Sequence, residues 1–173
     1  MSKRMIFGTC VNDQKHLETA CDNMRADSIA VTGPRFVSNY PMRNYKRQDA
    51  WVLKLPGWYG ECGFAADGSG DMTGDNESDY YDERPLDLAT GERIEQDEHG
   101  APYRVHDMVR KGIKLPGDDG RLGDIRLLRR LLSEYRSVSL VEEAVKHGGT
   151  IAYKNVNNET GEMELAFDLP EAM

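Results

Sequence analysis

The last third of the chain carries the pattern that most restricts its fold, a long amphipathic helix followed directly by two short strands. Asp124 stands where a helix N-cap is expected, and Gly148-Gly149 ends the helical spacing. The segments TIAYKNV and EMELAFDL then flank the turn NNETG, which predicts a β-hairpin. The apolar positions of the helix are Leu128, Leu131, Leu132, Tyr135, Val138, Val141, Ala144 and Val145. Its other faces carry Arg126, Arg129, Arg130 and Arg136. We expect this helix to pack on the hairpin.

The first part of the chain predicts a strand, a helix and a second strand. Residues 5–7 form a short apolar strand, and Asn12 or Asp13 is a suitable N-cap for the segment that follows. Residues 28–32 are apolar and β-branched, so we expect a second strand that Gly33-Pro34 ends. The helix between them is indicated by apolar residues at i, i+3, i+4 and i+7, namely Leu17, Ala20, Cys21 and Met24.

Two extended segments in the middle of the chain predict the centre of a sheet. Trp51, Leu53 and Leu55 alternate along the first, and after Pro56-Gly57 the run WYGECGFA resumes extended character, as in a hairpin. Combined with the flanking elements, this pattern predicts an α+β fold in which a small, mostly antiparallel sheet is packed by two helices. The length of 173 residues suits a single domain, 1–173.

Residues 66–120 differ sharply in composition and predict a long, irregular, acidic insertion with at most one short element of its own. No lysine or arginine occurs from Leu55 to Glu83, and turn-forming residues stay dense as far as Gly120. A run with so few apolar residues is not expected to order itself. Its carboxylates suit a basic partner, and the candidate partner-binding residues are Asp67, Asp71, Asp75, Glu77, Asp79, Asp82 and Glu83.

The same acidic run supports a third hypothesis, a metal-dependent enzyme that uses the Asp-rich loop. Oxygen-bearing side chains alternate from Asp71, as a hard cation such as calcium requires. Counted from Asp71, however, the sixth and twelfth positions of an EF-hand loop hold Asn76 and Asp82 instead of glycine and glutamate. The histidines and cysteines form no HxH, HExxH or CxxC motif. We therefore assign no metal ligand and no cofactor.

A basic and aromatic run at residues 35–48, RFVSNYPMRNYKRQ, has the composition of a nucleic-acid groove. A solvated loop or an edge strand is the simpler interpretation, because Pro41 stands in its middle. The net charge of −8 also disfavours a general nucleic-acid binder. A nucleic-acid-binding accessory protein is therefore the alternative function, and its candidate residues are Arg35, Tyr40, Arg43, Tyr45, Lys46 and Arg47.

The sequence lacks the common motifs of nucleophilic catalysis and phosphate binding. There is no GxSxG, no GxxxxGK[ST] and no GxGxxG, and Gly68-Ser69-Gly70 is one residue short of a nucleophile elbow. We therefore expect no enzymatic activity and assign no catalytic residue. No stretch has the roughly eighteen apolar residues of a membrane span, and the start MSKRMIFGTC lacks the features of a signal peptide. The sequence predicts a cytoplasmic protein with no membrane partner.

Three segments together resemble a known family. The first two segments are the opening KRMIFGTCVNDQKHLETACDNM and the central WYGECGFA, and the third is the long helix with Tyr135 and Ala144, followed by His147-Gly148 and TIAYKNVNNETGEMELAF. They are similar to the hypothetical chloroplast reading frame thirty-five family of chloroplasts, cyanobacteria and bacteriophages. The central match uses Tyr59, Gly63 and Phe64, with an interval one residue longer than in the family. The resemblance covers about half of the chain and does not include 66–120. It implies a fold and a phage or plastid setting, but no catalytic residue, because the family has no assigned reaction.

These observations favour an interaction protein over an enzyme. The leading hypothesis is a phage-encoded, non-enzymatic protein that binds a host or phage macromolecule in the host cytoplasm, through the acidic segment or an exposed sheet edge. A basic protein that handles nucleic acid is a suitable partner, since carboxylates then take the place of phosphates.

Overall fold

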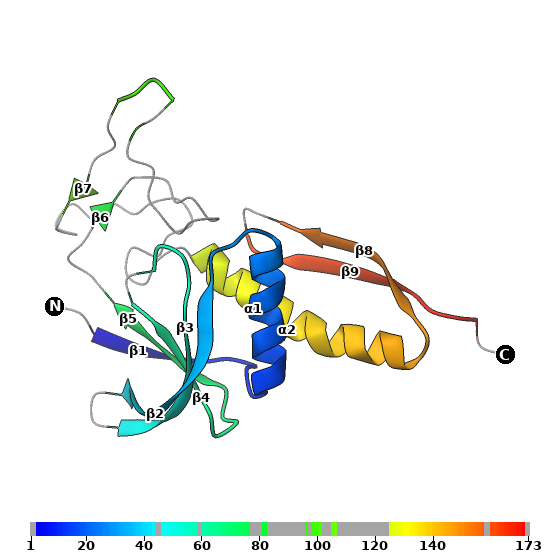
Figure 1. Ribbon diagram of the computed structural model, residues 1–173, viewed down its shortest axis with the longest axis horizontal. Helices are drawn as coiled ribbons and strands as arrows, with labels where there is room; N and C mark the ends of the chain where they lie inside the picture. The colour runs from blue at the N-terminus through cyan, green and yellow to red at the C-terminus, as the bar shows by residue number, and fades with distance from the viewer. Residues whose placement is uncertain are drawn as a thin grey trace.

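The computed structural model describes residues 3–43, 46–58, 60–76, 81–82, 96, 98–101, 105–106, 125–157 and 160–171 (Figure 1). It has the predicted α+β architecture. Within the described part of the chain, the elements in order are β1 (Lys3–Gly8), α1 (Gln14–Ala26), β2 (Thr32–Arg43), β3 (Lys46–Lys54), β4 (Cys62–Ala65), β5 (Asp71–Asn76), β6 (Tyr81–Asp82), β7 (Val105–His106), α2 (Ile125–Lys146), β8 (Thr150–Val156) and β9 (Met163–Asp168).

The main sheet has five strands in the order β1-β5-β4-β3-β2, and every neighbouring pair is antiparallel. Strands β8 and β9 form a separate hairpin, and β6 pairs with β7. Helix α1 lies across the main sheet, while α2 and the β8–β9 hairpin extend away from it toward the C-terminus (Figure 1). The molecule is therefore elongated, with the sheet at one end and the hairpin at the other.

Helix α1 begins and packs as its sequence predicts. The Asp13 side chain accepts a hydrogen bond of 3.0 Å from the backbone N–H of His16, which satisfies one of the first free amides of the helix. The predicted apolar stripe is fully buried: Leu17, Ala20, Cys21 and Met24.

One hydrophobic core joins α1 and α2 to the inner face of the sheet. Trp51, Phe64 and Met72 are its largest sheet residues, and α2 contributes Leu131 and Tyr135. Two of the three cysteines, Cys21 and Cys62, belong to this core. Burial raises the pKa of the thiols of Cys21 and Cys62 to about 12, so both are neutral and weakly nucleophilic at physiological pH.

A second apolar cluster lies on the opposite face of the sheet, where the long edge strand β2 bends over its neighbours. Its members are Tyr40, Met42, Ala50, Val52 and Ala65, with Val37 packed against them. The ring of Tyr40 lies over Gly63 of β4, so close that a Cβ added to Gly63 would stand 2.5 Å from Tyr40 Cε1. Strand β2 also contacts β1, β4 and β5, so the sheet curls around this cluster.

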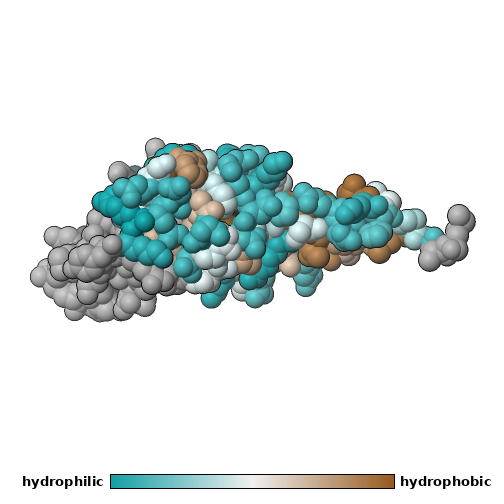
Figure 2. Space-filling view, turned by 90° about the horizontal axis from the view of Figure 1, so that it is seen from below, coloured by the Kyte–Doolittle hydropathy of each residue, from teal (hydrophilic) through white to brown (hydrophobic). Residues whose placement is uncertain are grey.

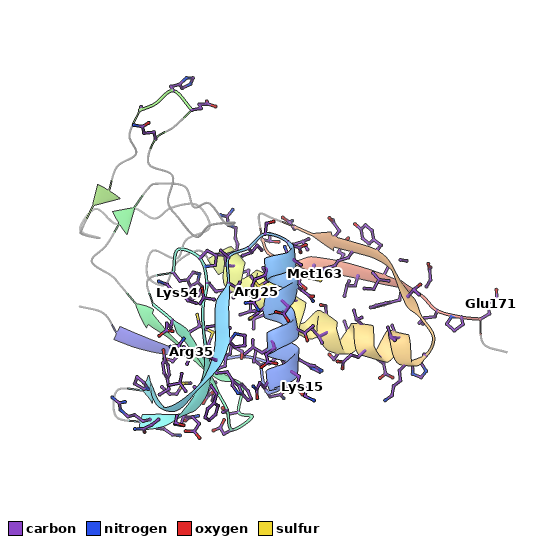
Figure 3. The ribbon with its side chains drawn as sticks, viewed as in Figure 1. Lys15, Arg25, Arg35, Lys54, Met163 and Glu171 are labelled. Carbon is purple, nitrogen blue, oxygen red and sulfur yellow. The ribbon has the colours of Figure 1, made fainter. Side chains whose placement is uncertain are left out.

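The start of β2 differs from the prediction. We expected a strand at residues 28–32 that Gly33-Pro34 would end, but the strand begins at Thr32 and runs through Pro34. The register shifts between Thr32 and Arg35, and β2 is an edge strand, so the missing N–H of proline removes no ladder bond there. Arg25 of α1 holds the start of β2 in place by donating to the carbonyl oxygens of Val31 and Gly33, at 3.1 and 2.6 Å (Figure 3).

The predicted irregular insertion is wrong for residues 71–76, which form β5 between β1 and β4. This strand is hard to recognise in the sequence because Met72 is its only large apolar residue. Thr73 and Gly74 supply the other buried positions. The turn before it is held by Asp67, whose side chain accepts from the backbone N–H of Ser69. For the rest of the insertion we expected at most one short element, and the structure describes one pair of two-residue strands there, β6 and β7. Most of 77–120 lies outside the described residues.

The C-terminal helix and hairpin match the prediction. Strand β8 pairs with β9 from Val156–Met163 to Thr150–Asp168, and Gly148, at a φ of 77°, follows the end of α2. Asp124, the expected N-cap, lies outside the described residues. Arg130 departs from the pattern, because it is buried, with 7% of its surface exposed, and does not lie on a solvent face. In the described part of the chain, neither helix combines the length and hydropathy that a membrane crossing requires.

Gly63→Ala tests the curled sheet. The new methyl group would meet the Tyr40 ring and also lie 3.2 Å from Thr73 Cγ2, so we expect the free energy of unfolding to fall by about 1–3 kcal/mol, measured by urea denaturation. Gly8→Ala is the control, because a Cβ there meets no described atom within 4 Å. Equal stability of the two variants would mean that β2 does not fold over β4.

Candidate functional site: the helix–hairpin arm

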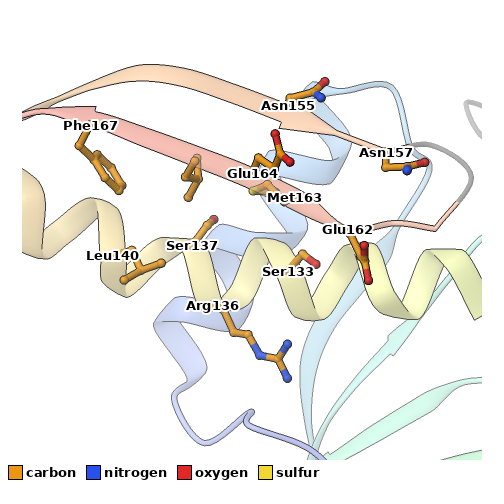
Figure 4. A pocket seen from close by; sticks show the side chains of 11 residues that line it. Ser133, Arg136, Ser137, Leu140, Asn155, Asn157, Glu162, Met163, Glu164 and Phe167 are labelled. Atoms are coloured by element: carbon orange, nitrogen blue, oxygen red, sulfur yellow. The ribbon is translucent and has the colours of Figure 1, made fainter.

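The second half of α2 and the β8–β9 hairpin form a projection that we call the arm, residues 133–169. Burial alternates along β9: Met163, Leu165 and Phe167 are half-buried, while Glu164 and Asp168 are exposed. Period-two alternation places these residues on opposite faces of the hairpin. The apolar face of β9 is therefore turned toward α2, as the side chains in Figure 4 show.

An open groove of about 560 Å³ lies between α2 and the hairpin. On the helix side, Ser133, Ser137 and Leu140 project toward Met163 and Phe167 of β9 (Figure 4). Two of these three helix positions are small serines, so the helix does not fill the space beneath the strand. The remaining lining residues are Arg136, Asn155, Asn157, Glu162, Glu164 and Leu165.

Exposed apolar side chains are concentrated on the arm. Of the six large hydrophobic residues that are exposed in the described part of the chain, all but Phe36 belong to it. Figure 2 shows apolar surface along this end of the molecule. The five arm residues and their exposed fractions are Leu140 (55%), Val145 (61%), Ile151 (47%), Tyr153 (48%) and Leu169 (62%).

A buried charge cluster attaches the arm to the rest of the molecule. The side chain of Glu134 is fully buried and accepts from Arg130 Nε at 3.1 Å and from Lys154 Nζ of β8 at 3.2 Å. Arg130 also pairs with Asp27, just beyond α1, and Asn23 of α1 donates to Glu134 at 3.4 Å. Two carboxylates and two cations thus neutralise one another across α1, α2 and β8.

A second contact holds α2 against the start of α1. The hydroxyl of Tyr135 accepts from the backbone N–H groups of Asn12 and Asp13 and donates to Asn12 Oδ1, each at 3.0 Å. The His16 ring meets the Tyr135 ring edge-on and bonds Glu142 at 3.0 Å. The base of α2 is therefore fixed at its polar contacts as well as in the core.

The candidate acidic residues do not lie in one irregular loop. Asp67 is in the β4–β5 turn, where hydrogen bonds from Ser69 lower the pKa of its carboxyl group. Asp71 and Asp75 belong to β5, and Asp82 to β6. Glu77, Asp79 and Glu83 lie outside the described residues. Among the described residues, no group of three or more His, Cys, Asp or Glu side chains is placed to hold a metal ion.

The candidate basic and aromatic residues lie along β2 and the start of β3. Arg43 pairs with Lys46 in the strand register, and Arg47 donates to the Asn39 carbonyl. Arg35 is held by Glu61 at 2.5 Å, and this hydrogen bond raises the pKa of the guanidinium group. Tyr40 is buried over Gly63, so its ring has no free face for a base. Tyr45 lies outside the described residues.

Comparisons with protein-family models, with curated proteins and with solved structures found no match to this chain. The resemblance to the chloroplast reading frame thirty-five family stays a prediction.

Sequence reasoning located the arm but missed its groove and its charge cluster. The i, i+4 spacing of Arg130 and Glu134 was visible, but such a pair is usually solvent-exposed on a helix. The burial of the pair depends on residues distant in sequence. Asp27 lies 103 residues from Arg130, and Lys154 lies 20 residues from Glu134.

Glu134→Gln tests the charge cluster. This near-isosteric change leaves Arg130 and Lys154 without their shared carboxylate, so we expect a loss of about 3 kcal/mol in the free energy of unfolding, measured by urea denaturation. Glu143→Gln removes a carboxylate from an exposed position of the same helix and should change stability by less than about 0.5 kcal/mol. The cluster would not be an anchor if both substitutions had the same small effect.

Proposed function

We propose that this chain is a non-enzymatic interaction protein that binds a host or phage protein through the helix–hairpin arm. The observation that carries the proposal is the clustering of exposed apolar side chains on the arm, beside an open groove. Apolar surface that gathers on one projection of a folded protein is characteristic of a binding surface, whereas scattered apolar residues are not.

The chemistry of the groove supports binding over catalysis. Its lining contains neither histidine nor cysteine, and the hydroxyl of Ser137 donates to the Glu134 carbonyl at 2.7 Å, within its own helix. A serine nucleophile needs an adjacent base within hydrogen-bond reach, and the Ser137 hydroxyl is bonded to its own helix backbone instead.

The phage setting rests on the family resemblance in the closing helix and hairpin. The acidic segment remains a second candidate contact for a basic partner, and the proposal does not depend on it. No specific observation favours nucleic-acid binding, since Tyr40 is buried and Arg35 is paired with Glu61.

The test compares partner recovery by surface variants of the full chain. Leu140→Ser and Ile151→Ser remove exposed apolar side chains from α2 and β8, so they should leave stability almost unchanged. If the arm is the binding surface, each should weaken recovery of a partner from expressing or infected cells by about tenfold, measured by quantitative affinity capture.

Phe36→Ser is the matched control, because Phe36 is equally exposed, at 56%, but lies on β2 outside the arm. It should retain the partner. Loss of the partner in Phe36→Ser together with its retention in both arm variants would refute the arm as the binding surface. Deletion of residues 66–83 is unsuitable as a test, since it would remove β5 from the sheet.

A further inference from the structure

The direction of the backbone groups in β9 shows which of them are available to a partner. The N–H of Asn157 donates to the Glu162 carbonyl at 2.8 Å. Hydrogen-bonded and non-bonded pairs alternate along an antiparallel ladder, so Asn155–Glu164 is the next bonded pair and Lys154–Leu165 is a non-bonded pair. Leu165, like Met163, therefore directs its N–H and C=O away from β8.

No described strand pairs with this outer edge of β9, because the sheet that contains it has β8 as its other member. An edge of this kind, with unpaired N–H and C=O groups, is a ready template for another strand. An isolated two-stranded hairpin is also marginally stable in water, so a third strand would add to its stability.

The charge along β9 restricts the kind of strand that fits. From Asn155 to Glu171 the chain contains five acidic residues and no basic one. Glu164 borders the groove, but strand alternation directs its exposed carboxylate, like that of Asp168, to the face opposite Met163, Leu165 and Phe167. There the Tyr153 hydroxyl donates to Glu164 at 3.5 Å and adds no positive charge. Lys154, the neighbouring cation on β8, is bound to buried Glu134 and does not neutralise Glu164 or Asp168. This face of β9 therefore complements lysine or arginine on an adjacent strand.

The other face of an added strand would lie on the α2 side of the hairpin, beside the groove. There Leu140, Met163, Leu165 and Phe167 supply apolar surface, which suits small or medium apolar side chains. The side chains of a strand alternate between the two faces of a sheet. The arm thus selects for a segment in which basic and apolar residues alternate.

We propose that β9 takes up an extended segment of a partner protein as a third strand, with lysine or arginine over Glu164 and Asp168 and apolar side chains over the groove. This inference rests on the proposed function and names the chemistry of its partner. The recognition mode is β-strand addition, in which backbone bonds give affinity and alternate side chains give specificity.

The experiment measures binding of a labelled, capped Lys-Val alternating hexapeptide to the full chain by fluorescence anisotropy. The alternating peptide should bind, and a Glu-Val alternating peptide or the block sequence Lys-Lys-Lys-Val-Val-Val should bind at least about tenfold more weakly. If the alternating and block peptides bound equally, charge alone would explain the binding, and the proposal would be overturned.

Two sets of variants locate the peptide. The pair Glu164→Lys with Asp168→Lys should weaken binding about tenfold or more, whereas the charge-matched pair Glu18→Lys with Glu143→Lys, on exposed helix positions, should weaken it much less. Leu165→Pro, which removes an outward N–H, should bind more weakly than Leu165→Ala, which keeps it. Equal binding within either comparison would overturn the proposal.

Two results separate this inference from the proposed function. If Leu140→Ser and Ile151→Ser lose the natural partner while the Glu164→Lys, Asp168→Lys variant keeps it, the arm is a binding surface but not for a basic strand. If sedimentation equilibrium shows a dimer that Leu165→Pro dissociates, the occupant of the edge is a second copy of this chain. Either result contradicts the proposed basic strand.

Discussion

The fully buried carboxylate of Glu134 sets the position of the arm relative to the sheet. A charge of this kind is stable only where cations and hydrogen bonds replace the water that it has lost. Arg130 and Lys154 supply the cations, and Asp27 balances the second positive charge. Since these groups belong to α2, β8 and the residue that follows α1, the cluster is satisfied when the three elements keep this arrangement. Tyr135 and the helix–helix core hold the base of α2 in the same arrangement.

The properties of the arm follow from this attachment. A hairpin of two strands does not bury enough surface to be stable alone, and packing against a helix compensates. Lys154 fixes the hairpin to α2 from the β8 side, and the small serines of α2 leave the β9 side underfilled. As a result, β9 combines a fixed position with an open groove and an outer edge with which no strand in the described part of the chain pairs. For the proposed partner strand, such a preformed site would lose little conformational entropy on binding.

The elements whose apolar residues recur with a clear period were predicted correctly from the sequence. A strand with a single large apolar residue was not. The stripe from Leu17 to Met24 and the hairpin around NNETG were correct because helical and alternating spacing are local properties. Strand β5 was missed because, apart from Met72, its buried positions are filled by threonine and glycine. The burial of Arg130 and Tyr40 was missed for a different reason. Both depend on partners distant in sequence, Asp27 for the arginine and Gly63 for the tyrosine, and no local pattern reports such contacts.

Amide-resolved hydrogen exchange along β9 tests the central claim most directly, because it reads the direction of each N–H in the intact protein. In the free chain, the amide of Glu164 should exchange slowly, whereas those of Met163 and Leu165 should exchange at nearly unprotected rates. Both fast amides should become protected when the alternating Lys-Val peptide is bound. Slow exchange of Leu165 in the free chain, or no added protection in the complex, would contradict an open β9 edge that accepts a strand.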